Sequence, residues 1–178
     1  MKQHYDIVIV GGGMVGASLA CALLPASEQL DLNIAVIEAF PMPEASELVY
    51  QPSYDSRATA LAYGARTLYE LMGIWDTLRE HLSPIKHIHV SDRGRFGAAR
   101  LHAEDEHVSA LGYVVENHWL GRVLLDRLQQ SDAGRVDFIC PAEVMDIQPG
   151  AKQMGLSVKH NDEVQQLTAE LVVMADGG

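Results

Sequence analysis

The segment from residue 6 to residue 38 constrains the fold more than any other part of the chain. An apolar strand over residues 7–10 runs into the glycine-rich turn 11–16 and a helix. A second apolar strand follows over residues 34–37 and ends in Glu38. This order is the βαβ pattern that binds dinucleotides, with the pyrophosphate at the first turn. The segment therefore predicts a Rossmann-like α/β domain.

Each glycine of the motif has a separate physical role. Gly11 permits a tight turn out of the strand, and Gly13 has no Cβ, so a pyrophosphate can approach its backbone. Gly16 lets the following helix pack close to the sheet. We expect that helix over residues 14–24, with its N-terminal N–H groups facing the phosphates and its end near Pro25.

Glu38 narrows the choice of ligand. A carboxylate at the end of the second strand can accept hydrogen bonds from ribose hydroxyls, and it would repel a 2′-phosphate. NADP is therefore disfavoured at this position, and FAD and NAD remain. The competing interpretation is an ordinary glycine-rich turn, which the surrounding strand–helix–strand order argues against.

Composition excludes several classes of protein. The 178 residues suffice for one domain of ordinary size, and the net charge of −11 argues against nucleic acid or anionic lipid as a general partner. The first strand begins so early that we expect no signal peptide, and no apolar run reaches the roughly 18 residues of a membrane-spanning helix. Cys21 and Cys140 are predicted to be thiols in a reducing compartment, which indicates a cytoplasmic protein.

The rest of the chain indicates a nucleotide domain interrupted by antiparallel strands. The long, proline-containing loop after Glu38 differs from the direct connection that is usual in NAD domains. A helix is expected from Asp55 or Ser56 through Met72, a shorter one over residues 75–82, and a third from Asn117 or His118. Apolar patterns predict strands over residues 85–90, 99–102, 113–115, 136–139, 143–147, 154–159, 163–167 and 171–174.

These elements suggest three segments. Residues 1–83 and 113–178 would form the nucleotide domain, and residues 84–112 would form a strand excursion from it. The last apolar strand runs directly into Asp176 and Gly177. A buried strand of this kind normally needs neighbours on both faces, so we expect the chain to be the first part of a longer protein.

Several motifs give the chain a resemblance to a known family. They are the glycine turn with Glu38, residues 55–61 (DSRATAL) and the Asp-Gly pair at 176–177. With these motifs the chain resembles the FAD-dependent aromatic hydroxylases that share the fold of p-hydroxybenzoate hydroxylase. Residues 87–94 (HIHVSDRG) and 110–116 (ALGYVVE) are similar to the branch of this family that acts in ubiquinone biosynthesis.

The resemblance implies a set of cofactor-binding residues. Gly11, Gly13 and Gly16 would hold the FAD pyrophosphate, Glu38 would hold the adenosine ribose, and Met14 belongs to the same FAD-binding set. This implies an FAD-binding domain of the glutathione reductase type, incomplete at its C-terminus.

Two further positions and one motif are assigned with alternatives. Arg57 would contact FAD near the route of the nicotinamide nucleotide, although a surface arginine at a helix start is the ordinary alternative. Asp176 and Gly177 would serve both FAD and NAD(P)H, although Asp-Gly alone is a common turn. Asn117 would contact the flavin, or else cap the helix that it begins.

The resemblance also implies the reaction. NAD(P)H would reduce the flavin, and O2 would supply the oxygen atom that is transferred to a prenylated phenol, so no catalytic side chain is expected. Other ubiquinone-biosynthesis proteins at the inner face of the membrane are possible partners. The family's downstream Gly-Asp motif is absent, so we expect these 178 residues alone to be inactive.

Three other functions are weighed against this one. A flavin oxidase or dehydrogenase would share the βαβ motif without using a nicotinamide, but the setting of Arg57 argues against it. A non-catalytic nucleotide-binding module, complete as it stands, is the second. His81, His87 and His89 could suggest a metal site, but a partly exposed strand face explains them better, and no metal is expected.

Overall fold

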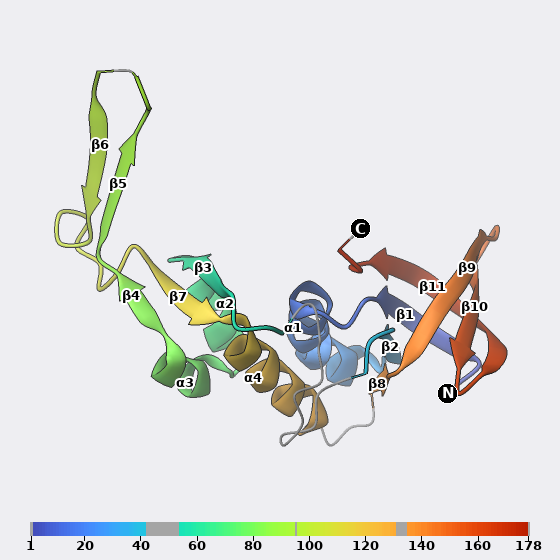
Figure 1. Cartoon of the computed structure of the whole chain (residues 1–178). Helices are drawn as coiled ribbons and strands as arrows, with labels where there is room; N and C mark the ends of the chain where they lie inside the picture. Colours follow the sequence, from blue (N-terminus) through green and yellow to red (C-terminus); the bar gives the residue numbers. More distant parts are fainter. Residues whose placement is uncertain (1, 42–53, 95, 131–134, 178) are drawn as a thin grey trace.

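A computed structural model describes residues 2–41, 54–94, 96–130 and 135–177 (Figure 1). Its elements form one large sheet, two smaller groups of strands and a layer of helices. In chain order they are β1 (His4–Val10), α1 (Met14–Leu30), β2 (Ile34–Ile37), β3 (Ala58–Ala62), α2 (Ala65–Leu71), α3 (Trp75–Leu78), the 3-10 helix η1 (Arg79–His81), β4 (Ser83–Ile85), β5 (His87–Ser91), β6 (Ala98–His102), β7 (Gly112–Glu116), α4 (Asn117–Gln129), β8 (Val136–Ile139), β9 (Ala142–Pro149), β10 (Met154–His160) and β11 (Glu163–Met174).

The large sheet has the strand order β8-β2-β1-β11-β10-β9. Its first four strands are parallel, with Val10 opposite Ile37 on β2 and opposite Met174 on β11. β11, β10 and β9 then form an antiparallel meander. The parallel strands consequently bring the ends of β1, β2 and β11 to one edge, which confirms the predicted Rossmann-like arrangement.

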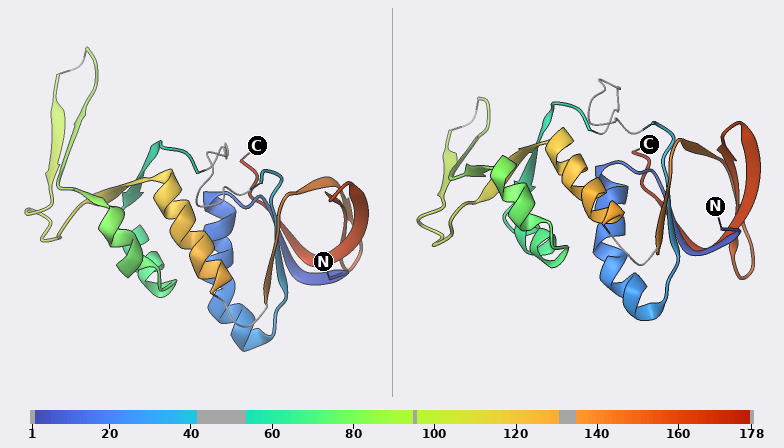
Figure 2. Two further views of the ribbon diagram at one scale, coloured as in Figure 1. Left: turned by 60° about the horizontal axis from the view of Figure 1, so that its bottom comes forward. Right: turned by 90° about the horizontal axis from the view of Figure 1, so that it is seen from below.

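The two faces of the parallel strands are covered in different ways. α1 and α4 lie side by side on one face, where Ile9, Leu24 and Leu124 are buried (Figure 2). On the other face the meander curls round, so that Val8 packs in one core with Leu156 and other residues of β10 and β11 (Figure 2). The chain therefore builds its second core by bending its own sheet.

β11 belongs to both parts of the sheet and is only partly covered. Val172 packs against the core under the meander, and Val173 packs against the helix-side core. Leu171 and Met174 remain 52% and 56% exposed. The strand runs from Glu163 to Met174 without a break, so the prediction of two separate strands was wrong. It is continuous because it pairs first with β10 and then with β1.

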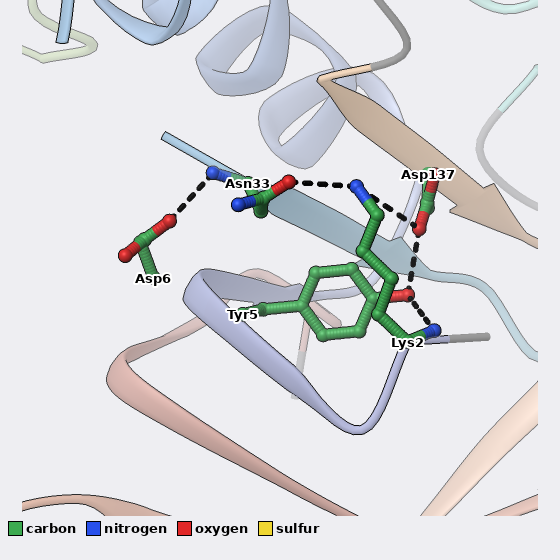
Figure 3. Close-up of polar contacts among 5 residues, drawn as sticks. All are labelled: Lys2, Tyr5, Asp6, Asn33 and Asp137. Atoms are coloured by element: carbon green, nitrogen blue, oxygen red, sulfur yellow. Dashed lines mark hydrogen bonds and ion pairs between the residues drawn. The ribbon is translucent and has the colours of Figure 1, made fainter. Parts of the chain in front are cut away.

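Polar contacts fasten β1, β2 and β8 together at the end that lies opposite the glycine turn (Figure 3). The Tyr5 hydroxyl donates to Asp137 Oδ2 at 2.8 Å, and Lys2 Nζ lies 4.0 Å from the same carboxylate oxygen. Lys2 Nζ also donates to Asn33 Oδ1 at 2.7 Å, and the Asn33 backbone N–H donates to Asp6 Oδ2 at 2.6 Å. These bonds satisfy polar groups where the sheet begins.

The remaining strands form two smaller groups. β3, β7 and β4 make a three-stranded antiparallel sheet, and β5 and β6 make a separate hairpin. The hairpin extends away from the rest of the molecule (Figure 1). The predicted strand at 85–90 is thus divided between β4 and β5, while those at 99–102, 113–115, 136–139, 143–147 and 154–159 are confirmed within about two residues.

Two helix boundaries differ from the prediction. α1 continues through Pro25 to Leu30, because Leu24 and Ser27 on either side of Pro25 are buried, and this packing outweighs the one helical hydrogen bond that proline removes. Residues 58–62 were expected to lie in a helix but form β3, whose hydrogen bonds to β7 outweigh local helix propensity. The helix at Asn117 is confirmed, and the expected helix 75–82 is α3 followed by η1.

We predict that Tyr5→Phe changes how stability depends on pH. Burial and the hydrogen bond to Asp137 raise the pKa of Tyr5 from 10.0 to about 12. The native state therefore favours the protonated hydroxyl, and this contribution is complete below pH 10 and is lost as the pH rises towards 12. Tyr5→Phe should lower the free energy of unfolding by about 1 kcal/mol at pH 8 and flatten the loss of stability at alkaline pH.

Urea unfolding at pH 8 and at steps above pH 10 provides the measurement. Tyr63→Phe, at a tyrosine that is 42% exposed, is the control and should change little. An alkaline loss of stability as steep in Tyr5→Phe as in the unmodified chain would contradict the prediction.

Candidate dinucleotide site

A cavity of about 560 Å³ lies at the edge of the sheet where β1, β2 and β11 end. Ligand sites usually have volumes of about 300–1,000 Å³, and open α/β sheets place them at the carboxyl ends of their strands. The glycine turn, the segment after β2, the strand β9 and the segment after β11 all contribute. Its lining includes Gly11, Gly13, Glu38, Phe40, Met145 and Asp176.

Close backbone contacts explain two of the motif glycines. Gly11 has φ +101° and donates its N–H to the Ile37 carbonyl at 2.8 Å, which confirms the tight turn. A Cβ on Gly11 would lie 2.5 Å from the Ala175 carbonyl oxygen. A Cβ on Gly16 would lie 1.9 Å from the Gly11 carbonyl oxygen and 3.2 Å from Ile9 Cγ2. Gly16 therefore allows α1 to approach both the sheet and the turn.

The start of α1 lies at this cavity. Gly13 is buried, lines the cavity and is the N-cap residue of α1, without a capping side chain. The first turn of α1 also lacks acidic residues, so its positive end suits an anionic group such as a pyrophosphate. Met14 is half-buried and packs against the helix-side core, so its place in the FAD-binding set stays a prediction.

Glu38 has a structural role that the sequence did not reveal. Its side chain is almost fully buried; Oε2 accepts the Gly12 N–H at 2.7 Å and Oε1 accepts the Phe40 N–H at 2.8 Å. An ionised carboxylate has about four acceptor positions, so these two bonds leave capacity for ribose hydroxyls. The carboxylate can therefore hold the glycine turn and a ribose at the same time.

The Asp-Gly pair lies beside the glycine turn. The Ala175 N–H donates to the Val10 carbonyl at 2.7 Å, and this bond carries the chain past Gly11. Asp176 lines the cavity, and Gly177 has φ +77°, a conformation that favours glycine. The tertiary structure thus brings residues 11 and 176 together, as the FAD-binding assignment requires.

Arg57 and Asn117 form a second group that does not line this cavity. Arg57 Nε donates to Asp55 Oδ2 at 2.6 Å, while the Arg57 side chain is 72% exposed. Desolvation works against ionisation of Asp55, but hydrogen bonds from Arg57 and its charge outweigh this and lower the pKa of Asp55. Arg57 precedes β3 and lies at the surface, so in the alternative of a surface arginine at a helix start only the helix is wrong. Contact of Arg57 with FAD stays a prediction.

Asn117 is a buried residue that forms hydrogen bonds with the segment around Arg57. It is 4% exposed, accepts from Thr59 Oγ1 at 2.7 Å and donates to Asp55 Oδ1 at 3.4 Å. Its backbone N–H donates to the Arg57 carbonyl at 2.8 Å. The N-cap of α4 is Glu116, so the interpretation of Asn117 as a cap was wrong. Contact of Asn117 with a flavin stays a prediction.

Tyr54 connects the two groups, and the sequence did not single it out. It is 8% exposed, and its hydroxyl donates to the Gly12 carbonyl at 2.6 Å. The signal that could have found it is its position directly before the DSRATAL motif. The loop between Glu38 and Tyr54 includes residues 42–53, which lie outside the described residues.

Among the described residues, the three histidines considered for a metal do not come together in the spacing of metal ligands. The His81 ring stacks on Trp119 with centroids 3.6 Å apart, whereas His87 Nδ1 lies 2.8 Å from His102 Nδ1. In the part of the chain that the structure describes, one group has the spacing of metal ligands: His4, Asp6 and Glu170, whose ligand atoms lie within 4.8 Å of one another. This group is largely exposed and lies at the start of β1, far along the strand from the cavity.

The cysteines take part in packing and local hydrogen bonds. Cys21 is buried in α1 and its thiol donates to the Leu124 carbonyl at 3.4 Å, while burial raises the pKa of this thiol to about 12. Cys140 Sγ lies 3.1 Å from the Phe40 carbonyl oxygen. Among the described helices, none combines the length and apolar character needed to cross a bilayer.

Comparison with known proteins identifies the family. The family model described as FAD-NAD(P)-binding matches residues 8–178, so the chain belongs to this family of FAD- and NAD(P)-binding domains. The predicted fold, the choice of FAD and the family resemblance are thereby confirmed.

Curated relatives extend this result. The chain is 35% identical over 173 residues to ubiquinone hydroxylase UbiL of Rhodospirillum rubrum, covering 97% of this chain and 37% of that protein. It is 24% identical over 186 residues to the ubiquinone biosynthesis monooxygenase COQ6 of Dictyostelium discoideum, covering 98% and 37%. The chain thus spans little more than a third of the length of these relatives.

Solved structures share the fold. p-Nitrophenol 4-monooxygenase PnpA of Pseudomonas putida superposes with a TM-score of 0.73 at 16% identity, over 99% of this chain and 41% of that one. OxyS anhydrotetracycline hydroxylase of Streptomyces rimosus gives a TM-score of 0.77 at 18% identity, over 98% and 32%.

We predict that Gly16→Ala weakens FAD binding at least about tenfold and lowers the free energy of unfolding by about 1–3 kcal/mol, the usual effect of overpacking. The new methyl group would collide with the Gly11 carbonyl and push the turn out of position. Titration of the apoprotein with FAD, followed by flavin fluorescence, measures the affinity.

Gly64→Ala is the matched control. Gly64 has a right-handed helical conformation, and an added Cβ there would meet no atom within 4 Å. This variant should keep its FAD affinity. An FAD affinity in Gly16→Ala equal to that of the unmodified protein would contradict the prediction.

Proposed function

We propose that the intact protein containing this chain is a flavin-dependent monooxygenase that hydroxylates a prenylated phenol in ubiquinone biosynthesis, using NAD(P)H and O2. The observation that supports this most strongly is the cavity formed by Gly11, Glu38 and Asp176 in a member of the FAD-NAD(P)-binding family. Similarity to a ubiquinone hydroxylase along 97% of the chain favours this substrate class.

The residues at the cavity fit the adenosine and pyrophosphate part of FAD. In this proposal the Gly13 backbone and the start of α1 bind the pyrophosphate, and Glu38 accepts hydrogen bonds from the ribose. Asp176 and Gly177 close the turn beside them. When bound, FAD supplies the redox chemistry of the reaction, and the protein positions it and limits the access of water.

Arg57 is the residue that we assign to the nicotinamide nucleotide. Its side chain is 72% exposed, and its ion pair with Asp55 fixes one side of the guanidinium. The shape and charge of the planar guanidinium suit a phosphate or a flavin carbonyl. Asn117 holds the backbone of this segment in place, and we also keep it as a residue near the flavin.

The proposed division of the chain follows the predicted segments. Residues 1–83 and 113–178 provide the FAD-binding domain, and residues 84–112 lead towards a substrate domain. The projecting hairpin of β5 and β6 supports this division. The isolated 178 residues are expected to lack hydroxylase activity, because the substrate domain and the downstream Gly-Asp motif would lie elsewhere in the protein.

The cellular place follows from the substrate. A prenylated phenol partitions into lipid, so we propose a cytoplasmic protein that works at the inner face of the membrane. The net charge of −11 disfavours direct attraction to anionic lipid. Association through other ubiquinone-biosynthesis proteins is therefore part of the proposal.

We predict that NAD(P)H reduces the flavin of the intact protein and that Arg57→Ala slows this reduction about tenfold or more, because a charge-assisted contact is lost. Anaerobic stopped-flow measurement of flavin absorbance gives the rate. Under ¹⁸O2, mass spectrometry should find one labelled oxygen atom in the prenylated phenol.

Arg122→Ala is the control for the removal of a positive charge, since Arg122 lies on α4 and its Nε is 4.0 Å from Asp126 Oδ2. It should leave the reduction rate unchanged. A bound flavin that neither NADH nor NADPH reduces would favour an oxidase or dehydrogenase instead. An intact protein without affinity for FAD would favour a non-catalytic module.

A further inference from the structure

The ring of Tyr54 packs directly against the backbone of α4 at Gly121. A Cβ added to Gly121 of α4 would lie 2.1 Å from Cδ1 and 2.4 Å from Cε1 of the Tyr54 ring. The helix therefore has glycine at the point where the ring lies against its backbone. The ring lies against the helix, and its hydroxyl donates a hydrogen bond to the Gly12 carbonyl at 2.6 Å.

The Gly12 residue is held from two sides. Its N–H donates to Glu38 Oε2 at 2.7 Å, and its carbonyl accepts from Tyr54. A Cβ on Gly12 would lie 2.7 Å from the Phe138 ring and 2.8 Å from Glu38 Cβ. Gly12 is not one of the three motif glycines, yet the position of its Cβ is closed off by two side chains.

The direction of the Gly12 carbonyl determines where the next N–H points. A trans peptide is planar, with its N–H directed opposite to its C=O. The carbonyl points towards Tyr54, so the Gly13 N–H points away from Tyr54. Gly13 lines the cavity, and its N–H belongs to the group of donors available to a pyrophosphate at the start of α1.

The hydroxyl stays a donor at physiological pH. Burial raises the pKa of Tyr54, and the nearby charge of Glu38 raises it further. The proton therefore remains on Oη, where the carbonyl of Gly12 can accept it.

Tyr54 also belongs to the Arg57 segment. It directly precedes Asp55, whose backbone carbonyl accepts the His118 N–H at 3.1 Å and whose carboxylate accepts from Arg57. The same residue thus contacts the pyrophosphate end of the site and begins the segment assigned to the nicotinamide side.

We infer that Tyr54 is a positioning residue for FAD, which orients the Gly13 amide towards the pyrophosphate and joins the glycine turn to the Arg57 segment. The inference rests on the proposed FAD-binding role of the cavity. It assigns a role to a hydroxyl that makes no redox or acid–base contribution of its own.

Tyr54→Phe in the intact protein tests the role of the hydroxyl, because phenylalanine keeps the ring packed against Gly121 and removes only the hydroxyl group. The dissociation constant for FAD should rise about tenfold, because the hydrogen bond that orients the Gly12–Gly13 peptide is lost. The apparent KM for FAD should rise with it, while kcat at saturating FAD stays within about twofold.

Tyr5→Phe is the matched control. Tyr5 is also a buried tyrosine whose hydroxyl donates one hydrogen bond, to Asp137, but it lies at the opposite end of β1. It should lose stability and keep its FAD affinity. Equal FAD affinity in Tyr54→Phe and the unmodified protein, or an equal loss in both variants, would overturn the inference.

A second measurement does not require FAD. Hydrogen–deuterium exchange of the apoprotein should become faster in Tyr54→Phe, both in the peptide that contains Gly13 and in the peptide that contains Arg57. Tyr5→Phe should leave both peptides unchanged. If the unmodified protein binds no FAD, the proposed function fails, and unchanged exchange in Tyr54→Phe would separately overturn the coupling of the two segments.

Discussion

The close packing of the glycine turn is the constraint on which the site depends. The turn lies between the ends of three parallel strands and the first residue of α1, with the Gly11 and Gly16 backbones too near to their neighbours for any side chain. This packing leaves the Gly13 backbone and the start of α1 at the surface of the cavity. Binding capacity here comes mainly from backbone donors, whose direction is fixed by the fold.

Side chains from distant segments complete what the glycines begin. Glu38 holds Gly12 from the end of β2, and Tyr54 holds it from the segment before β3. Each group thereby satisfies a buried backbone donor or acceptor that water cannot reach. Structural support and ligand recognition are combined in the Glu38 carboxylate, because its two oxygens have more acceptor positions than the backbone uses.

Two hydrophobic cores enclose the parallel strands that carry the site. α1 and α4 cover one face of the parallel strands, and the meander of β9, β10 and β11 bends back to cover the other. These two cores fix the cavity at the edge of the sheet. Asn117, at the start of α4, connects the helix-side core to the Arg57 segment through hydrogen bonds to Thr59 and Asp55. The β5–β6 hairpin, in contrast, extends away from both cores (Figure 1).

The sequence by itself determined the βαβ unit, the glycine turn, Glu38 at the second strand and most strands, because these features depend on local spacing and periodicity. It misjudged Pro25 and residues 58–62, where the packing of α1 and the pairing with β7 override local propensity. Only the tertiary structure decided that Tyr54 meets Gly12, 42 residues away, and that Thr59 meets Asn117, 58 residues away. Such contacts arise when separate elements pack together, and no periodic pattern along the chain records them.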